Sequence, residues 1–221
     1  MISSSRAVIF ANGELRDLGA VHRVLQPGDF LVAADGGLRH LRSLGLLPNL
    51  LIGDLDSVSE EDADLLRSSG VEVRRYPVEK NETDLELALE AVSQAGYSSI
   101  RVVAALGGRL DQTLANLFLL RLPGLEHLDL RLDDGLEEVV LIRHRLTLVG
   151  GPGDVVSLLP LDGPAGGIQT DGLYYQLKHE TLFPEHTRGI SNVMLGSEAS
   201  ISLERGQLLC VHSRSKNEEI L

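Results

Sequence analysis

The sequence predicts a protein built in two different halves: an α/β N-terminal domain with a mostly parallel sheet, and an all-β C-terminal sandwich. In residues 1–125, short apolar runs alternate with segments of helical spacing, which is typical of a parallel sheet covered by helices on both faces. In residues 126–217, short strand-like runs are separated by turns rich in glycine and proline, and no helical period recurs. We therefore expect a domain boundary between these two stretches.

The strands expected in the first domain are the apolar runs at residues 7–10, 30–34, 49–52, 71–74 and 100–106. Between the last two, Leu85, Ala88, Leu89 and Val92 recur at the i, i+3, i+4, i+7 spacing of an amphipathic helix. A weaker form of the same pattern covers residues 114–121, where a second helix is expected before Pro123-Gly124 breaks the chain.

In the second domain, the runs at residues 128–132 and 139–142 flank Asp133-Asp134-Gly135, which is a hairpin signal. Further short strands are expected at residues 146–149, 155–159, 173–177, 199–203 and 207–211. Two turns rich in glycine, at residues 150–154 and 163–167, separate some of them. Because no helix is expected here, the strands should pair in antiparallel fashion.

Composition narrows the possible partners and environments. The 221 residues are 43% hydrophobic and can bury one large core or two small ones. The formal net charge of -12 argues against nucleic acid or an anionic membrane surface as the main partner. Cys210 is the single cysteine and lies in an apolar run, so we expect a core residue rather than a disulfide. No stretch approaches the roughly 18 apolar residues of a membrane span, and we expect a cytoplasmic protein.

Two carboxylates follow the third predicted strand, at Asp54 and Asp56. Side chains alternate along an extended backbone, so this spacing places both carboxylates on one side. At about 4 Å and an effective dielectric constant near 20, they would repel each other by on the order of 4 kcal/mol. A divalent cation or a shared proton would relieve this repulsion. The alternative is a solvated turn without further function.

The loops after the second to fifth predicted strands all carry residues suited to phosphate or metal binding: Asp35-Gly36-Gly37, then Asp54 and Asp56, then Lys80, Thr83 and Asp84, then Gly107-Gly108-Arg109-Leu110-Asp111. In a parallel sheet these loops meet at the carboxyl edge, where ligands of such folds bind. Structural explanations compete for some of them. Thr83 and Glu86 fit a helix capping box, and two successive glycines can serve a tight turn. A tight turn does not require the cation of Arg109.

Two common catalytic motifs are absent from the sequence. It contains no G-x-S-x-G and no G-x-x-x-x-G-K-[ST], which argues against a serine hydrolase and a P-loop enzyme. The seven histidines are scattered without ligand spacing.

The motifs, taken in order, resemble those of thiamine pyrophosphokinases: Ala34-Asp35-Gly36-Gly37, Gly53-Asp54-Leu55-Asp56-Ser57, Lys80-Asn81-Glu82-Thr83-Asp84, Gly107-Gly108-Arg109-Leu110-Asp111-Gln112 and Gly189-Ile190-Ser191-Asn192. The resemblance covers residues 6–213 and departs at Asn81, where many bacterial members have aspartate. It implies transfer of a pyrophosphoryl group from ATP to the hydroxyl of thiamine, giving thiamine diphosphate and AMP with Mg²⁺ as cofactor. It also implies a homodimer, with thiamine held where the α/β domain of one subunit meets the sandwich of the other.

The resemblance also implies roles for individual residues. Metal and phosphate would be positioned by four carboxylates: Asp35, Asp54, Asp56 and Asp84. Asp56 or Asp84 would orient or deprotonate the thiamine hydroxyl. ATP would contact Lys80, Thr83, Gly107, Gly108, Arg109, Asp111 and Gln112. Thiamine would contact Ser191 and Asn192.

Two other functions remain open from the sequence. One is a diphosphokinase that acts on another acceptor, such as a hydroxymethyl-pterin, although the Ser191-Asn192 segment favours thiamine. The other is a non-catalytic module that binds a metal or a nucleotide. The pair Lys80 and Arg109 argues against a plain cation sensor, which has no use for them.

Overall fold

The computed structural model describes residues 6–56 and 58–215. Its internal contacts divide the chain into two compact units, Met1–Gly135 and Leu136–Leu221, and each is described by itself. No helix within the described ranges is long and apolar enough to cross a bilayer.

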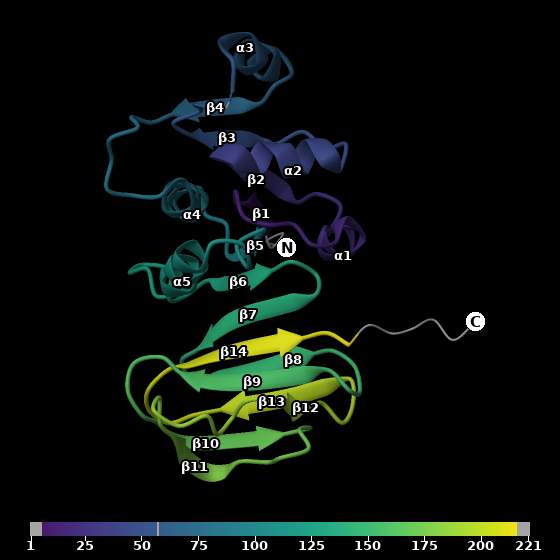
Figure 1. The fold of residues 1–221 in the computed structure, drawn as a ribbon, viewed down its shortest axis with the longest axis vertical. Helices are drawn as coiled ribbons and strands as arrows, with labels where there is room; N and C mark the ends of the chain where they lie inside the picture. Colours follow the sequence, from purple (N-terminus) through teal and green to yellow (C-terminus); the bar gives the residue numbers. More distant parts are fainter. Residues whose placement is uncertain (1–5, 57, 216–221) are drawn as a thin grey trace, which may run out of the picture. The chain divides into compact units, whose positions relative to one another are not determined.

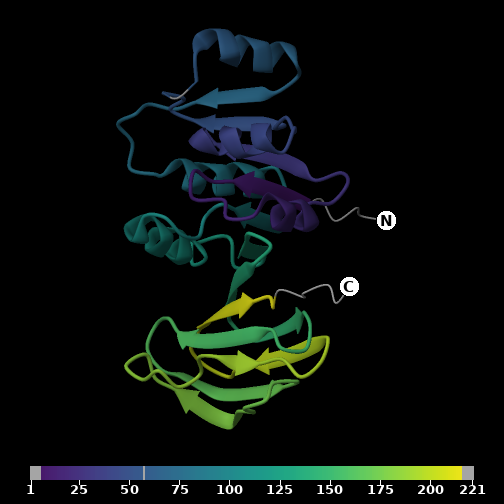
Figure 2. The same cartoon turned by 45° about the vertical axis from the view of Figure 1, so that its right-hand side comes forward.

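The first unit contains one parallel sheet of six strands (Figures 1 and 2). The strands are β1 (Arg6–Phe10), β2 (Phe30–Ala34), β3 (Leu50–Gly53), β4 (Glu72–Arg75), β5 (Ser99–Val103) and β6 (Asp129–Asp133). Their spatial order is β6-β5-β1-β2-β3-β4, and every neighbouring pair is parallel. The predicted parallel sheet is therefore confirmed.

Helices cover both faces of this sheet. They are α1 (Leu18–Val24), α2 (Leu38–Ser43), α3 (Glu60–Ser68), α4 (Asp84–Gln94) and α5 (Leu110–Leu119), with a 3-10 turn η1 (Asp35–Gly37) before α2. The chain runs outward from β1 to β4 and then returns to β5 on the other side of β1. Because such crossovers are right-handed, α1, α2 and α3 lie on one face and α4 and α5 on the opposite face. Figure 1 shows α1 and α2 on one side of the strands and α4 and α5 on the other.

The strands at the centre of this sheet are buried on both faces. Every residue from Ala7 to Phe10 is fully buried, as is the pair Leu51 and Ile52. This explains why these strands appear in the sequence as continuous apolar runs. Helix α4 buries six residues, including all four of the predicted apolar face, whereas α5 buries none.

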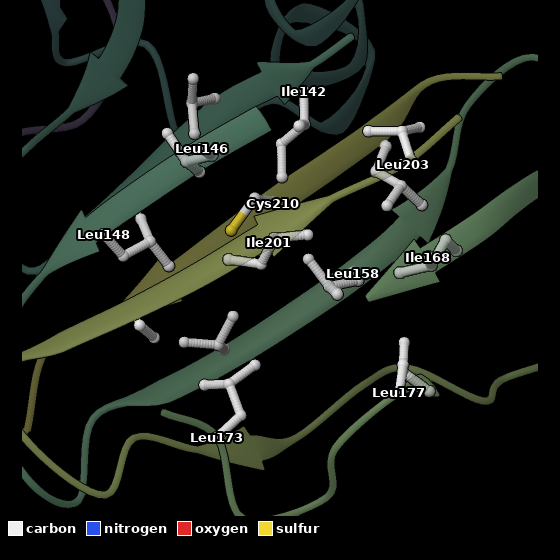
Figure 3. Close-up of a cluster of buried hydrophobic side chains, with 14 of the residues drawn as sticks. Ile142, Leu146, Leu148, Leu158, Ile168, Leu173, Leu177, Ile201, Leu203 and Cys210 are labelled. Atoms are coloured by element: carbon white, nitrogen blue, oxygen red, sulfur yellow. The ribbon is translucent and has the colours of Figure 1, made fainter. Parts of the chain in front are cut away.

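The second unit is a sandwich of two antiparallel four-stranded sheets (Figure 1). One sheet has the order β12-β9-β14-β7 and the other has the order β11-β10-β13-β8. The strands are β7 (Glu137–Ile142), β8 (Arg145–Val149), β9 (Val155–Pro160), β10 (Ala165–Asp171), β11 (Lys178–Leu182), β12 (Asn192–Val193), β13 (Glu198–Ser202) and β14 (Leu208–Ser213). Figure 3 shows the core between the sheets, where Ile142 and Leu158 of one sheet face Ile168 and Ile201 of the other. Cys210 is buried in this core, as predicted.

Two expected strands and one expected turn differ from the structure, since β10 begins at Ala165, inside the turn expected at residues 163–167. Residues 173–177 form a turn with a single bridge between Leu173 and Met194, so the strand predicted there is wrong. Gly172, with φ +75°, ends β10 just before this segment, and its apolar side chains Leu173 and Leu177 are buried without extended pairing. The strand expected at residues 100–106 already ends at Val103, because Ala104 adopts a left-handed conformation with φ +56°.

Candidate active site

A cavity of about 640 Å³ lies at the carboxyl ends of the parallel strands. The sheet order changes direction between β1 and β5, and this switch point is where open α/β sheets bind ligands. The residues that line the cavity come from the loops after β1, β2 and β5, from the segment before α4, and from helices α2, α4 and α5. Of the sequence-predicted residues, those lining it are Asp35, Lys80, Thr83, Asp84, Gly107, Gly108, Arg109 and Gln112.

Three carboxylates gather beside this cavity, at the ends of β2 and β3. Asp35, Asp54 and Asp56 each offer a carboxylate oxygen, and these oxygens lie within 4.8 Å of one another. The grouping does not come from an extended strand, which was the expected reason. β3 ends at Gly53, Leu55 is left-handed with φ +59° and buried, and Asp54 Oδ1 accepts a hydrogen bond from Asp56 N at 3.1 Å. A tight turn, fixed by burial of Leu55, therefore brings the carboxylates together.

The environment of Asp35 reflects this crowding. Burial raises the pKa of the Asp35 carboxyl, and the negative charges of Asp84, Asp54 and Asp56 raise it further, against a hydrogen bond from the Gly36 backbone. Asp35 also holds a left-handed backbone with φ +44°. Carboxylates crowded in this way are the ligands that a hard divalent cation prefers, so the trio fits such a cation.

Lys80 links the trio to Asp84. Its Nζ lies 3.1 Å from Asp84 Oδ1 and 4.0 Å from Asp54 Oδ2. Asp84 Oδ1 is buried and accepts no hydrogen bond from the described part of the chain. The Lys80 ammonium compensates the charge of this buried oxygen, and the negative charge of Asp84 also raises the pKa of the Asp35 carboxyl, so Asp84 lies close to the trio. Asp84 therefore fits a metal or phosphate site together with the trio.

The start of α4 confirms the predicted cap. Thr83 is the N-cap, and its Oγ1 accepts a hydrogen bond from Glu86 N at 3.2 Å. This cap fixes the helix start and thereby the position of Asp84, the first helical residue. Thr83 thus has a structural role and also lines the cavity.

The loop between β5 and α5 is fastened by the helix that follows it. Asn116 donates to the Ala105 carbonyl at 2.9 Å, and Thr113 Oγ1 lies 3.2 Å from the Gly107 carbonyl. Arg109 and Asp111 form an exposed bidentate pair with distances of 2.5 and 3.1 Å. The hydrogen bond from Arg109 lowers the pKa of the Asp111 carboxyl. Asp111 does not belong to the cavity lining.

Several lining residues were missed by the sequence analysis. They are Asn12, Gly13 and Glu14 after β1, Arg39 on α2, Glu82 before α4 and Asn116 on α5. The loop after β1 could have been found, because it also follows a parallel strand and meets the same edge. Close packing fixes it: a Cβ on Gly36 would collide with the Asn12 side chain, and a Cβ on Gly37 with the Phe10 carbonyl.

Ser191 and Asn192 lie in the sandwich unit and differ in their surroundings. Ser191 is exposed and left-handed with φ +57°, and its backbone N–H donates to Ser157 Oγ at 3.0 Å. Asn192 is buried, and its side-chain amide accepts from Tyr175 N and donates to the Tyr175 carbonyl at 2.9 and 2.7 Å. The Asn192 amide therefore holds the turn that carries the exposed pair Tyr174 and Tyr175.

Comparison with known proteins identifies the two units. Residues 21–131 match the family model described as "Thiamin pyrophosphokinase, catalytic domain", and residues 142–208 match "Thiamin pyrophosphokinase, vitamin B1 binding domain". The chain is 24% identical over 192 residues to the thiamine pyrophosphokinase of Bacillus subtilis, covering 82% of this chain and 86% of the relative.

Two solved structures share the fold. The crystal structure of thiamine pyrophosphokinase from Bacillus subtilis superposes with a TM-score of 0.84 at 22% identity, covering 96% of this chain and 100% of the other. The yeast enzyme superposes with a TM-score of 0.78 at 17% identity, covering 99% of this chain and 90% of the other. The two family models match successive parts of the chain in order, and one of them alone spans half of it. The chain belongs to the thiamin pyrophosphokinase family.

Proposed function

We propose that the chain transfers the terminal diphosphate of ATP, as one unit, to the hydroxyl group of thiamine, giving thiamine diphosphate and AMP. The observation that carries this proposal is the trio of carboxylates within 4.8 Å of one another, beside a cavity lined by cations at the switch point of the sheet. In this reaction the hydroxyl oxygen bonds to the β-phosphorus, while the bond from that phosphorus to the α–β bridging oxygen breaks. The hydroxyl proton leaves to a carboxylate or to water.

Mg²⁺ would be held by Asp35, Asp54 and Asp56, with Asp84 completing the group. Support comes from the spacing of the trio and from the negative charge of Asp84, which acts on Asp35 of the trio and raises the pKa of its carboxyl. When bound, the ion would neutralise part of the charge on the polyphosphate. Asp56 is the most exposed of the trio, so Asp56 or Asp84 would orient the thiamine hydroxyl or accept its proton.

The nucleotide would lie along the cavity. Lys80, already among the carboxylates, would bind phosphate oxygens, and Arg109 would bind them from the opposite loop. Thr83, Gly107, Gly108 and Gln112 would contact ATP as lining residues. Asp111 would act by orienting Arg109, with which it is paired.

Thiamine would be bound with the help of the sandwich unit. Ser191 offers an exposed hydroxyl, and Asn192 fixes the neighbouring turn at Tyr175. The acidic rim suits thiamine as well as metal, because thiamine is a cation.

We further propose a homodimer in which each site uses two subunits. Helix α5 carries an exposed apolar stripe of Leu110, Leu114 and Phe118, which are 72%, 46% and 56% exposed. Spacing of four residues places these side chains on one face of the helix. Since Gln112 and Asn116 of the same helix line the cavity, a second copy that covers the stripe would lie beside the site.

The proposal is tested by incubating the protein with MgATP and either thiamine or a hydroxymethyl-pterin, and by separating the nucleotides formed. We expect AMP in equal amount to thiamine diphosphate, and no AMP above background with the pterin. ADP together with thiamine monophosphate would exclude diphosphate transfer. AMP formed only with the pterin would reassign the acceptor.

A further inference from the structure

Arg39 differs from the other cations of the cavity in its partners. Three cations line the cavity: Arg39, Lys80 and Arg109. Lys80 is paired with Asp84, and Arg109 is paired with Asp111. Within residues 6–56 and 58–215, Arg39 forms no ion pair with a carboxylate, and Nη2 donates instead to the carbonyls of Asn12 and Gly13, both at 3.0 Å. Carbonyl oxygens hold the guanidinium in place but leave its positive charge uncompensated.

The loop after β1, whose carbonyl groups bind Arg39, is itself held in place. The backbone of the loop after β1 is held by hydrogen bonds from Ala11 N to the Val103 carbonyl and from Gly13 N to the Ala104 carbonyl, both at 2.9 Å. His40 is buried, and its Nε2 lies 3.0 Å from the same Gly13 carbonyl that Arg39 binds.

The charge of His40 matters for Arg39, because His40 Nε2 lies 3.4 Å from Arg39 Nε. Burial lowers the pKa of His40, and the charge of Arg39 lowers it further, against the hydrogen bond to Gly13. The lowered pKa favours the neutral imidazole, whose Nε2 donates a proton to the Gly13 carbonyl in one tautomer and accepts one from Arg39 Nε in the other. A neutral His40 contacts the loop after β1 without adding a second positive charge, and Arg39 remains the cation beside this loop.

We propose that Arg39 binds a phosphate group of the nucleotide in this cavity, alongside Lys80. The inference rests on the proposed function for the identity of the nucleotide. In the described part of the chain Nη1 of Arg39 donates no hydrogen bond, so this group is available to a ligand. A guanidinium suits phosphate oxygens because it offers several donors in a fixed plane. The same cavity is also lined by four carboxylates: Glu14, Asp35, Glu82 and Asp84. In these acidic surroundings, the positive charge of Arg39 favours binding of the negatively charged polyphosphate.

The test compares Arg39→Met with Arg42→Met. Methionine keeps an unbranched, helix-compatible side chain and removes the charge. Arg42 lies on the same helix, and its side chain is 51% exposed and 3.5 Å from Asp62, away from the cavity lining. Binding of ATP and of adenosine, each with Mg²⁺ present, is measured by calorimetric titration or by competition, together with the melting temperature of each variant.

We expect Arg39→Met to weaken ATP binding by about 10- to 100-fold, the range for loss of one charged hydrogen-bonding group. Adenosine binding and the melting temperature should stay close to those of the parent, and Arg39→Lys should recover part of the ATP affinity. Arg42→Met should bind both ligands like the parent. Unchanged ATP affinity in Arg39→Met would overturn the inference. Equal loss for ATP and adenosine would also overturn it, since Arg39 would then only hold the loop.

The test of Arg39 and the test of the proposed function can fail independently of each other. The binding measurement needs neither thiamine nor turnover. A parent protein that binds ATP through Arg39 but forms no AMP would contradict the proposed reaction alone. A parent protein that forms AMP while Arg39→Met keeps full ATP affinity would contradict the inference alone.

Discussion

At the scale of single residues, the site is built from backbone conformations that ordinary residues avoid. Asp35 and Leu55 have positive φ angles, and Gly53, with φ +155°, lies where a Cβ would come within 2.9 Å of the Asp35 Cβ. Residues held in such conformations cost on the order of 1–3 kcal/mol each and cluster at functional sites. The surrounding core holds this turn in place, since Leu55 belongs to the same buried cluster as Phe10 and Leu51.

The first prediction concerns Asp56→Asn. The variant should fold as stably as the parent or slightly more so, because one charge of the crowded trio is removed. Turnover should fall on the order of 100-fold or more, since the charge stabilisation supplied by a bound metal is worth several kcal/mol. Melting temperature and initial rate check both parts, with the exposed Asp64 on α3, outside the cavity lining, mutated to Asn as the matched control. Turnover near that of the parent would make the trio a structural turn.

The residues missed by the sequence analysis were missed for different reasons. Asn12-Gly13-Glu14 follows β1 and meets the same edge, but an Asn-Gly pair also signals an ordinary turn. Arg39 lies within a helix, and whether its side chain reaches the cavity depends on where η1 ends and α2 begins. Asn192 looked like a ligand residue, but the sequence could not reveal that its amide binds the Tyr175 backbone.

At the scale of elements, the start of α4 combines a cap and a candidate catalytic residue. Thr83 supplies the cap, while Asp84 follows as the first helical residue and forms the 3.1 Å ion pair with Lys80. An aspartate in the first turn of a helix is also favoured by the helix dipole. Stability and activity therefore have to be separated by mutating each residue alone.

The second prediction separates the effects of Thr83 and Asp84 on stability from their effects on activity. Thr83→Ala should lose about 1 kcal/mol of unfolding free energy because the cap is lost. Asp84→Asn should lose little stability but most of the activity. Urea titration and initial rates at saturating Mg²⁺ measure the two effects. If Asp84→Asn remains fully active, the residue serves only the helix start.

The type of most long elements was predictable, because burial on one or both faces leaves a period in the sequence. The four strands of the first unit predicted at residues 7–10, 30–34, 49–52 and 71–74 lie within one residue of those observed. The wrong strand at residues 173–177 has apolar residues that are buried in a turn, where burial gives no strand pairing. Short apolar runs next to glycine therefore indicate that a segment is buried more reliably than they indicate whether it forms a strand or a turn.

At the scale of whole units, a buried charged cluster ties the sandwich together. His212 on β14 is fully buried, with Nε2 2.8 Å from Asp154 Oδ2 and Nδ1 3.5 Å from Glu138 Oε2. Asp154 also accepts hydrogen bonds from Gly151 N at 2.9 Å and from Ser215 N at 2.8 Å. Burial and the charge of Arg214 oppose protonation of His212, but the two carboxylates outweigh them and raise its pKa. The ring is therefore charged in the folded protein at pH values where it would be neutral in the unfolded chain.

The third prediction follows from the raised pKa of His212. A raised folded pKa stabilises the sandwich fully below the unfolded pKa of about 6.5, and the contribution is lost as the pH rises through the folded pKa. As the pH rises above about 6.5 and through the raised pKa of the folded protein, the parent should thus lose stability relative to His212→Gln, which cannot titrate. Hydrogen exchange of residues 208–213, corrected for intrinsic rates, localises the effect to β14. The same pH dependence in parent and variant would assign it to other groups.

The fourth prediction tests the proposed shared site. Asp56→Asn and Ser191→Arg, the latter placing a cation where the cationic substrate would bind, should each be inactive as homodimers. After full random exchange of equal amounts, about half the dimers are mixed, and each mixed dimer has one intact site. Activity should then approach about a quarter of that of the parent. No recovery despite demonstrated exchange would mean that each site is built within one chain.

The most direct test of the proposed chemistry follows the β-phosphorus of ATP. ATP labelled with ³²P at the β position is incubated with thiamine, Mg²⁺ and the protein, and the products are separated before the substrate is exhausted. Transfer of the diphosphate as one unit predicts that all transferred label lies in thiamine diphosphate, none in AMP, and that no thiamine monophosphate accumulates. Label retained in ADP, with thiamine monophosphate as the first product, would contradict the account.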